Sequence, residues 1–373
     1  MSPARSFAVE VVRKLRAAGY EALFAGGCVR DRLLGNEPSD YDVATNAVPE
    51  QIQAVFGRRK TLAIGAAFGV IAVVGPKEAG AVEVATFRRD LGYSDGRRPD
   101  GVAFCSAEED ALRRDFTING MFFDPLDERV IDYVGGERDL GLGVIRAIGD
   151  PRARFTEDKL RLLRGVRFAA RFGFALEDAT CAAIRELAPR VVDVSVERIA
   201  EELRKMLSLL GRVGAIETLR DVGLLQAVVP EWANAFATEQ GDMAWIAMLD
   251  ELRFSQELEF APVLARLFAP LPELLRTVPK ASTVAMCRRL KLSNDETDVI
   301  TWLVVHQDAL RDADALPWSE IQPLLIHRAA GDLVEWSRVC ACATRPFDRR
   351  RRLVRRPDDV AARTARSAAV ADR

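Results

Sequence analysis

Histidine, paired cysteines and long apolar runs are what this 373-residue sequence has least of. It has two histidines, and its six cysteines include no C-x-x-C pair (Cys28, Cys105, Cys181, Cys287, Cys340 and Cys342). This pattern argues against a zinc site, and scattered thiols are typical of a reducing cytoplasm. No apolar run approaches the roughly 20 residues that cross a bilayer, and the first residues lack the pattern of a secretory signal. We therefore expect a soluble, cytoplasmic protein with no membrane partner.

A strong net charge is also missing. The sequence carries 53 lysines and arginines against 55 aspartates and glutamates, a formal net charge of −2. Because no global basic field points to nucleic acid, any RNA site must be a local patch. The length allows two or more domains and a sizeable core.

A glycine pair and an arginine stand together near the N-terminus. Gly26 and Gly27 follow the apolar segment 20–25, and residues 28–34 have the pattern of a short helix. Backbone amides of such a turn, directed into a helix N-terminus, form a cradle for anions. Arg30 on that helix can add a charged fork to a phosphate. The segment therefore predicts a phosphate-binding turn.

Two aspartates follow closely. Asp40 and Asp42 flank Tyr41 in the alternating segment DYDVAT, which predicts a strand. Side chains at i and i+2 of a strand share a face, and carboxylates that close repel unless a cation lies between them. Two hard oxygen ligands beside a phosphate cradle are what magnesium-dependent phosphoryl or nucleotidyl transfer requires.

This order of motifs resembles the signature of the DNA polymerase β-type nucleotidyltransferases, GGxVRD followed by DxD. Within that superfamily the sequence looks like the class II tRNA nucleotidyltransferases (CCA-adding enzymes) and the related bacterial poly(A) polymerases. The matching motifs run from about Phe7 to Leu210, more than half of the chain. The resemblance implies an α+β fold: an N-terminal nucleotidyltransferase head with a small mixed β-sheet, then an all-α neck, body and tail. It also implies two Mg²⁺ ions as cofactor, held by Asp40 and Asp42.

Further head motifs match the same family. The apolar runs 68–74 and 81–87 predict a hairpin, and the resemblance adds Glu83 in the second run to the catalytic carboxylates, as a ligand or a helper. The polar segment 88–101 predicts a mobile loop, which in the family couples nucleotide selection to catalysis. In RRDFTIN the resemblance implies that Arg114 binds the nucleotide, together with the glycine turn, and that Asp115 and Asn119 support it.

The segment 156–168, TEDKLRLLRGVRF, predicts one amphipathic helix that starts at Phe155 or Thr156. Spacing alone favours an ordinary helix with solvated charges on one side. The resemblance to the family's ED-x-x-R-x-x-R-x-x-RF motif implies nucleotide binding instead, with Arg164 and Arg167 on the triphosphate or the tRNA end.

The same motif implies base recognition by Asp158 and Arg161. Cytosine and adenine each offer an amino donor beside a ring-nitrogen acceptor, whereas uracil and guanine present the reverse pattern. A carboxylate only accepts hydrogen bonds and a guanidinium only donates them. Asp158 would therefore take the amino group, Arg161 would face the ring nitrogen, and Glu157 would orient the pair.

Strand patterns fade beyond Asp150, which predicts three regions. These are a catalytic head at 1–145, a helical neck at 146–210 that recognises the base and the tRNA 3′ end, and an RNA-binding body and tail at 211–373. In the neck we expect Ser195 to cap a helix in the mainly structural SVER motif. The basic end beyond about Asp358 is expected to be poorly ordered.

The resemblance implies addition of C and A to the tRNA 3′ end from CTP and ATP, with release of pyrophosphate. Within this class, full CCA addition, A-only or CC-only addition and poly(A) polymerisation stay open, as does the oligomeric state. The full-length loop after Phe87 argues against CC-only addition, and IGAAFGVIAVV looks like the CCA branch. The intact aspartate pair argues against a different class, a catalytically silent RNA-binding relative.

Overall fold

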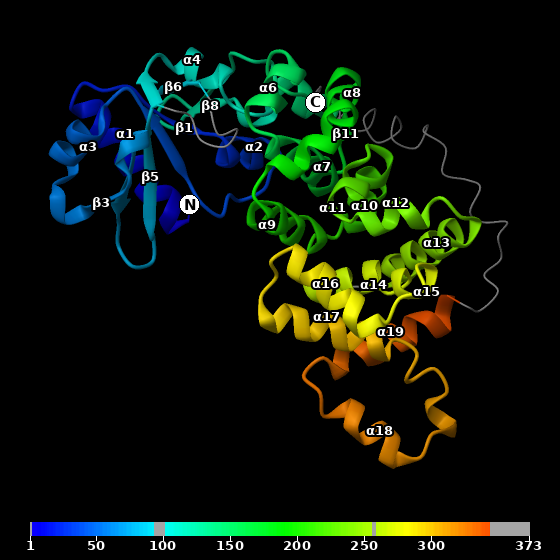
Figure 1. Cartoon of the computed structure of the whole chain (residues 1–373). Helices are drawn as coiled ribbons and strands as arrows, with labels where there is room; N and C mark the ends of the chain where they lie inside the picture. The colour runs from blue at the N-terminus through cyan, green and yellow to red at the C-terminus, as the bar shows by residue number, and fades with distance from the viewer. Residues whose placement is uncertain (1, 93–100, 256–258, 344–373) are drawn as a thin grey trace, which may run out of the picture.

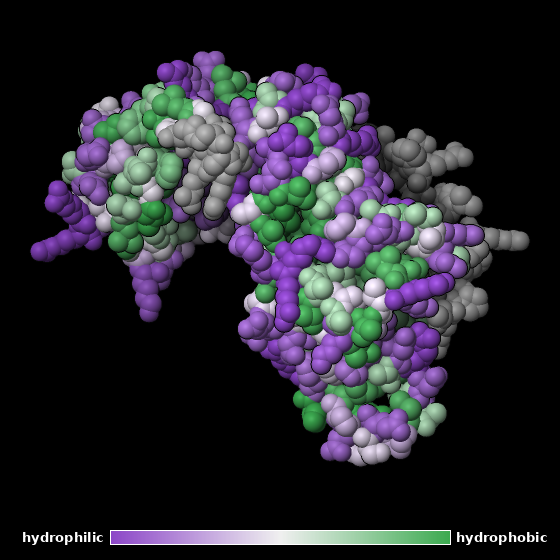
Figure 2. Space-filling model, viewed as in Figure 1, coloured by the Kyte–Doolittle hydropathy of each residue, from purple (hydrophilic) through white to green (hydrophobic). Residues whose placement is uncertain are grey.

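The chain forms a sheet-bearing head that continues into a long helical arm (Figure 1). The computed structural model describes residues 2–92, 101–255 and 259–343. This arrangement of a mixed sheet followed by helices confirms the expected fold class. On the face that Figure 2 shows, the surface is mostly hydrophilic with scattered apolar patches, and it is hollowed between the head and the arm.

The head is built on a seven-stranded mixed sheet with the strand order β3-β4-β5-β2-β1-β8-β9. These strands are β1 Ala22–Ala25, β2 Asp42–Thr45, β3 Thr61–Gly65, β4 Val70–Val74, β5 Ala81–Thr86, β8 Phe122–Asp124 and β9 Arg129–Ile131. All neighbours are antiparallel except β2 and β5, which run parallel and place Asp42 opposite Glu83. The expected hairpin is confirmed as β4 and β5.

The helices of the head are α1 Pro3–Ala17, α2 Gly27–Leu33, α3 Pro49–Phe56, α4 Ala107–Leu112 and α5 Gly136–Leu142, with short 3-10 turns at 58–60, 66–68 and 117–119. The apolar stripe of α1 is buried in the main core through Val11, Val12 and Leu15. Such stripes are readable in a sequence, and the short helix expected at 28–34 is confirmed as α2.

The segment expected to be a loop at 88–101 begins and ends as strands. β6 Arg88–Leu91 pairs antiparallel with β7 Gly101–Phe104 in a separate two-stranded sheet. Its polar composition hid this pairing, because both strands are only half-buried. Residues 93–100 lie outside the described part of the chain, so the expected mobility stays a prediction.

The neck differs from the expected single helix at 156–168. The chain forms α6 Pro151–Glu157 and α7 Leu160–Phe172, with a break at Asp158, whose φ of −139° and ψ of 103° are extended. Asp150 caps α6 with its carboxylate and Pro151 occupies the first turn, so this helix starts earlier than predicted. The Asp158 carboxylate accepts a hydrogen bond from the Leu160 amide at 3.1 Å and starts the second helix.

Head and neck share one hydrophobic core. The Phe116 ring lies 5.7 Å from the Phe168 ring and 6.5 Å from the Phe155 ring, centroid to centroid. A Cβ at Gly165 of α7 would lie 3.2 Å from Phe116 Cζ and 3.3 Å from Ile184 Cδ1. A larger residue at 165 would push these two side chains back by a few tenths of an ångström, so glycine allows the close packing of α7 on the Phe116 ring.

The rest of the neck and the arm are helical apart from a short parallel pair, β10 Val144–Ile145 and β11 Ala175–Leu176. The sequence did not indicate β11, which lies beyond the point where strand patterns fade. The helices are α8 Asp178–Leu187, α9 Val196–Leu207, α10 Arg212–Asp221, α11 Leu224–Val228, α12 Pro230–Ala235, α13 Glu239–Phe254, α14 Phe260–Phe268, α15 Leu271–Leu274, α16 Pro279–Arg289, α17 Asn294–His306, α18 Trp318–Leu325 and α19 Ala330–Ala343, with 3-10 segments at 188–193 and 313–315. In the described residues no helix is long and apolar enough to span a membrane. The predicted disordered end beyond Asp358 lies outside those residues.

Candidate active site

A cavity of about 600 Å³ lies where the head meets the neck, between α2, β2, the 113–119 segment and α7. Its lining includes every residue that the sequence singled out for catalysis or nucleotide binding except Glu83: Gly26, Gly27, Arg30, Asp40, Asp42, Arg114, Asp115, Asp158, Arg161, Arg164 and Arg167. The acidic pair (Asp40 and Asp42) and the pair expected to recognise the base (Asp158 and Arg161, the base-reading pair) therefore share one cleft. The individual roles of these residues stay predictions.

The glycine turn needs glycine at its first position. Gly26 has a φ of +69°, and a Cβ there would lie 3.1 Å from Arg114 Nη1. Its amide donates to the Met121 carbonyl, which ties the turn to the neighbouring strand β8. Gly27 then opens α2, so backbone amides of its first turn border the cavity. This geometry suits an anion.

Asp42 begins β2, and Asp40 lies two residues earlier, outside the strand, but both line the cavity. The pKa of Asp42 is raised to about 6, first because the surrounding protein removes water from its carboxyl and then because of the negative charges of Asp40 and Glu83. The positive charge of Arg114 opposes this shift. Glu83 is exposed on the neighbouring strand. Its charge acts on Asp42 although it does not line the cavity.

The acidic pair fits a magnesium site completed by other ligands. In the described residues no three His, Cys, Asp or Glu side chains gather closely enough to hold a metal ion. Mg²⁺ commonly binds one or two carboxylates and takes its remaining ligands from water and substrate phosphates. Asp40 and Asp42 match that donor set.

Asp115 joins the head to the neck. Its Oδ2 accepts hydrogen bonds from Arg164, the one from Nε at 2.8 Å, and its Oδ1 accepts from the Phe116 amide at 2.8 Å and from Asn119 Nδ2 at 3.0 Å. Burial alone would raise the pKa of Asp115, but Arg164 and these hydrogen bonds hold it at about 2. Arg30 extends the network by donating to Asn119 Oδ1.

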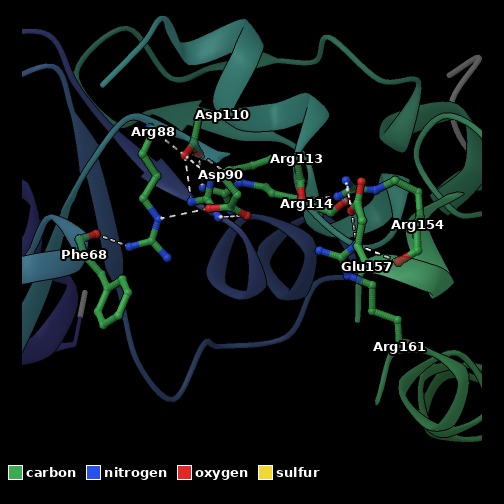
Figure 3. Close-up of polar contacts among 9 residues, drawn as sticks. All are labelled: Phe68, Arg88, Asp90, Asp110, Arg113, Arg114, Arg154, Glu157 and Arg161. Carbon is green, nitrogen blue, oxygen red and sulfur yellow. Dashed lines mark hydrogen bonds and ion pairs between the residues drawn. The ribbon is translucent and has the colours of Figure 1, made fainter. Parts of the chain in front are cut away.

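A second network crosses the head toward the base-reading pair (Figure 3). The Asp110 carboxylate forms ion pairs with Arg113 at 2.8 Å and with Arg114 at 2.9 Å. Burial alone would raise the pKa of Asp110, but these two cations hold it below its ordinary value. Arg88 and Arg113 each approach Asp90 at 3.9 Å. The Asp110 carboxylate thus fixes the guanidinium of Arg114 beside the glycine turn.

Arg154 carries this network across to the neck (Figure 3). Its Nη2 donates to the carbonyls of Arg113 and Arg114, the second at 2.7 Å. Its Nη1 donates to Glu157 at 2.5 Å, and its own carbonyl accepts from Arg161 at 2.9 Å. Glu157 also accepts from Arg161 at 2.9 Å, an arrangement that orients Arg161.

Asp158 is held by an arginine whose role sequence reasoning missed. Arg198 of the SVER motif donates from Nη1 to Asp158 Oδ1 at 3.3 Å and from Nη2 to Oδ2 at 3.0 Å. It lines the cavity, although the motif predicted a structural role. Ser195 occupies the N-cap of α9 as expected, but its side chain makes no capping hydrogen bond.

Positive charge gathers around the cavity. Its described lining holds eight arginines, including Arg113, Arg171 and Arg198, against five aspartates. Arg167, which the sequence assigned to substrate, bonds at 2.6 Å to the buried Glu202. A local excess of arginine in a chain of net charge −2 is the patch that binding of phosphates requires.

Comparison with known proteins gives two family-model matches. One is the poly(A) polymerase head domain, which matches residues 22–146. The other is described as a probable RNA and SrmB-binding site of polymerase A and matches residues 173–236. The first model covers the seven-stranded sheet of the head and the whole segment 113–119 that carries Arg114 and Asp115.

Similar proteins carry two names. The chain is 39% identical over 247 residues to poly(A) polymerase I of Haemophilus influenzae (63% of this chain, 53% of that protein). It is 45% identical over 210 residues to the CCA-adding enzyme of Enterococcus faecalis (56% of this chain, 50% of that protein). The alignments thus span about half the length of these relatives. The structure of the Bacillus stearothermophilus CCA-adding enzyme with CTP matches with a TM-score of 0.67 and 30% identity, over 92% of this chain and 82% of that one.

Proposed function

Because this chain belongs to the family of CCA-adding enzymes and bacterial poly(A) polymerases, we propose that it adds C and A to the 3′ end of tRNA from CTP and ATP without a template. The reaction forms a bond between the terminal 3′ oxygen and the α-phosphorus and releases pyrophosphate. One observation carries the proposal: the acidic pair and the base-reading pair open into one arginine-lined cavity.

The acidic pair supplies the catalytic centre of this proposal. Asp40 and Asp42 would hold two Mg²⁺ ions, which when bound acidify the attacking hydroxyl and neutralise the leaving pyrophosphate. Arg114, fixed by Asp110, and the amides of the glycine turn bind the triphosphate. Catalysis then rests on positioning and on charge neutralisation. Glu83 adds negative charge beside Asp42 and helps to attract the cations.

The base-reading pair is oriented for the donor–acceptor edge of C and A. Arg198 and the Leu160 amide take part of the acceptor capacity of Asp158, and its Oδ2 keeps a lone pair for an amino group. Arg161 uses Nη1 to bond within the neck, so Nε and Nη2 stay without a partner among the described residues and can donate to a ring nitrogen. Uracil or guanine would leave these charged groups unmatched, at a cost of roughly 1–3 kcal/mol each or more.

Poly(A) polymerisation is the second candidate, because poly(A) polymerase I of Haemophilus influenzae is 39% identical to the chain over 247 residues. The two activities differ in product length and in their use of CTP. tRNAs that end at the discriminator base, at C and at CC are incubated with each nucleotide separately, and products are resolved on a gel. Addition that stops after CCA supports the proposal, whereas long tails from ATP alone with no use of CTP would assign the second activity.

The metal site has its own test. Asp42→Ala should reduce incorporation by at least about 1000-fold, roughly 4 kcal/mol of transition-state stabilisation, while its circular dichroism and tRNA affinity stay near those of the unaltered protein. Glu78→Ala, in the exposed turn between β4 and β5, is the matched control and should leave incorporation unchanged. Turnover retained by Asp42→Ala would refute this assignment.

A further inference from the structure

One arginine at the cavity between head and neck is held only loosely. Arg171 lies in the last turn of α7, lines the cavity, and has a side chain that is 42% exposed. Among the described residues its guanidinium makes one hydrogen bond, from Nη2 to Asp31 Oδ2 of α2 at 3.4 Å. Charge-assisted hydrogen bonds are usually shorter, roughly 2.7–2.9 Å. Arg171 therefore keeps donors for a ligand in the cavity.

Arg171 also shares its carboxylate with a second arginine. Asp31 Oδ1 lies 2.8 Å from both Nε and Nη2 of Arg30. The two guanidiniums lie over the same ring, that of Phe172, at 4.7 Å for Arg30 and 5.2 Å for Arg171. Burial lowers the pKa of Arg30, Asp31 opposes this shift, and the positive charge of Arg171 adds to it. Two cations on one carboxylate leave an excess positive charge that an anion can neutralise.

The other arginines of α7 have firmer partners. Those that line the cavity recur three or four residues apart and share one face of the helix: Arg161, Arg164, Arg167 and Arg171. Arg164 bonds to Asp115 at 2.8 Å. Arg167 bonds to the buried Glu202 at 2.6 Å. Arg171 is thus the member of this row whose ion pair a ligand can most easily replace.

The row runs in the same order as the groups of a nucleoside triphosphate. Under the proposed function, Asp158 and Arg161 hold the base beside the start of α7. The ribose and then the phosphates follow the base, and the terminal phosphate lies farthest from it. Arg171 is ten residues beyond Arg161, a rise of about 15 Å along the helix. The planar fork of an arginine matches the oxygens of a phosphate.

We propose that Arg171 binds the γ-phosphate of the incoming nucleotide and holds the same phosphate in the leaving pyrophosphate. Its guanidinium then exchanges the weak contact with Asp31 for charge-assisted hydrogen bonds to phosphate oxygens. The γ-phosphate is not the reacting group, so Arg171 contributes to binding rather than to the chemical step. CTP and ATP carry the same phosphate, so Arg171 does not select the base. The inference rests on the proposed function in taking a nucleoside triphosphate as substrate.

Three cytidine nucleotides measure this contact without catalysis. In equilibrium dialysis of the full chain with Mg²⁺, Arg171→Gln should bind CTP at least about tenfold more weakly, the effect of losing hydrogen bonds between charged groups. CDP and CMP lack the γ-phosphate and should bind to the variant as to the unaltered chain. Arg152→Gln is the matched control, because Arg152 also bonds across two helices, to Glu186 at 2.7 Å, but does not line the cavity. Unchanged CTP binding by Arg171→Gln, or an equal loss for CDP or CMP, would overturn the inference.

A lysine separates the charge of Arg171 from its packing on Phe172. Arg171→Lys keeps the charge without the planar guanidinium and should bind CTP within about threefold of the unaltered chain. Both variants should melt within about 2 °C of that chain, because a partly exposed ion pair contributes little to stability. If lysine restored no binding, or if glutamine lowered the melting temperature by several degrees, Arg171 would have a structural role and the inference would fail.

Steady-state kinetics distinguish a nucleotide phosphate from a phosphate of the RNA. In Arg171→Gln the KM for CTP and that for ATP should rise by the same factor, while kcat and the KM for tRNA stay within about twofold. The inhibition constant of pyrophosphate should rise as well. A higher KM for tRNA with an unchanged KM for the nucleotides would assign Arg171 to the RNA. A changed preference between CTP and ATP would assign it to the base, and either result would overturn the inference.

Failure of this inference can be told from failure of the proposed function. A chain that adds C and A to tRNA, but whose Arg171→Gln variant binds CTP normally, would overturn only the inference. A chain that loses CTP binding but not CDP binding in Arg171→Gln, and that adds no nucleotide to tRNA, would overturn only the proposed function.

Discussion

Asp115→Asn removes one negative charge from the junction of head and neck and should destabilise the protein by about 3 kcal/mol. Removing one partner of a buried ion pair typically costs 3–5 kcal/mol, because the other charge stays behind unpaired. The Arg164 side chain is 33% exposed and can recover some hydration, so the lower end of that range applies. Asparagine keeps the shape of the side chain, and the effect therefore reports charge rather than packing.

The pH dependence gives an independent check of this magnitude. The pKa of Asp115 falls from its ordinary 3.8 to about 2, so its charged interactions stabilise the fold by about 2 kcal/mol at neutral pH. Because the folded pKa lies below the unfolded one, this contribution is complete above about pH 5 and is lost as the pH falls toward 2. At pH 3 about 1 kcal/mol of it is left.

Urea denaturation at pH 7 and at pH 3 measures both quantities. The difference in free energy of unfolding between the unaltered chain and Asp115→Asn should shrink by about 1 kcal/mol at the lower pH. Glu186→Gln is the matched control, since its ion pair with Arg152 is more than half exposed on both sides and should contribute less than about 1 kcal/mol. A difference below 1 kcal/mol at pH 7, or one that is the same at both pH values, would refute this account of the junction.

Two further predictions concern the glycine turn and the neck. Gly26→Ala should cost about 1–2 kcal/mol because of its positive φ. It should also raise KM for the nucleotide, because the new methyl group displaces the Arg114 guanidinium; calorimetry and steady-state kinetics measure the two effects, and an unchanged KM would contradict the second. Glu202→Gln leaves Arg167 buried without its ion-pair partner and should cost about 3–5 kcal/mol in urea denaturation, whereas a loss below 1 kcal/mol would show that the pair contributes little.

Much of the head could be predicted because its elements are half-buried. Strands such as 81–86 alternate between exposed and buried side chains, and α1 carries an apolar stripe, so both periods are visible in the sequence. β3 escaped prediction because Leu62 and Ile64 are exposed apolar residues of a strand at the edge of the sheet. Their side chains therefore give no sign of which face is buried.

The break between α6 and α7 could not be predicted, because the polar residues 156–159 that span it include no glycine or proline. Its cause is tertiary: Arg198, 40 residues later, pairs with Asp158 while that carboxylate accepts the Leu160 amide. The contacts within the site were equally hidden from sequence reasoning. The motifs indicated which residues meet at the cavity, because the chemistry depends on residue type. They did not indicate which of these residues bond to one another.

The contact between Phe116 and Gly165 couples the head to α7, which bears on the proposed choice between nucleotides. The ring follows directly after Asp115, and the helix that it supports carries Arg161 and Arg164. An outward swing of α7 would uncover the ring and open the shared core, so the segment with Asp115 and the helix with Arg161 are held as one rigid unit. Under the proposed function, we expect a cytosine and the larger adenine to be fitted by rotation of individual side chains, and not by a hinge between two lobes.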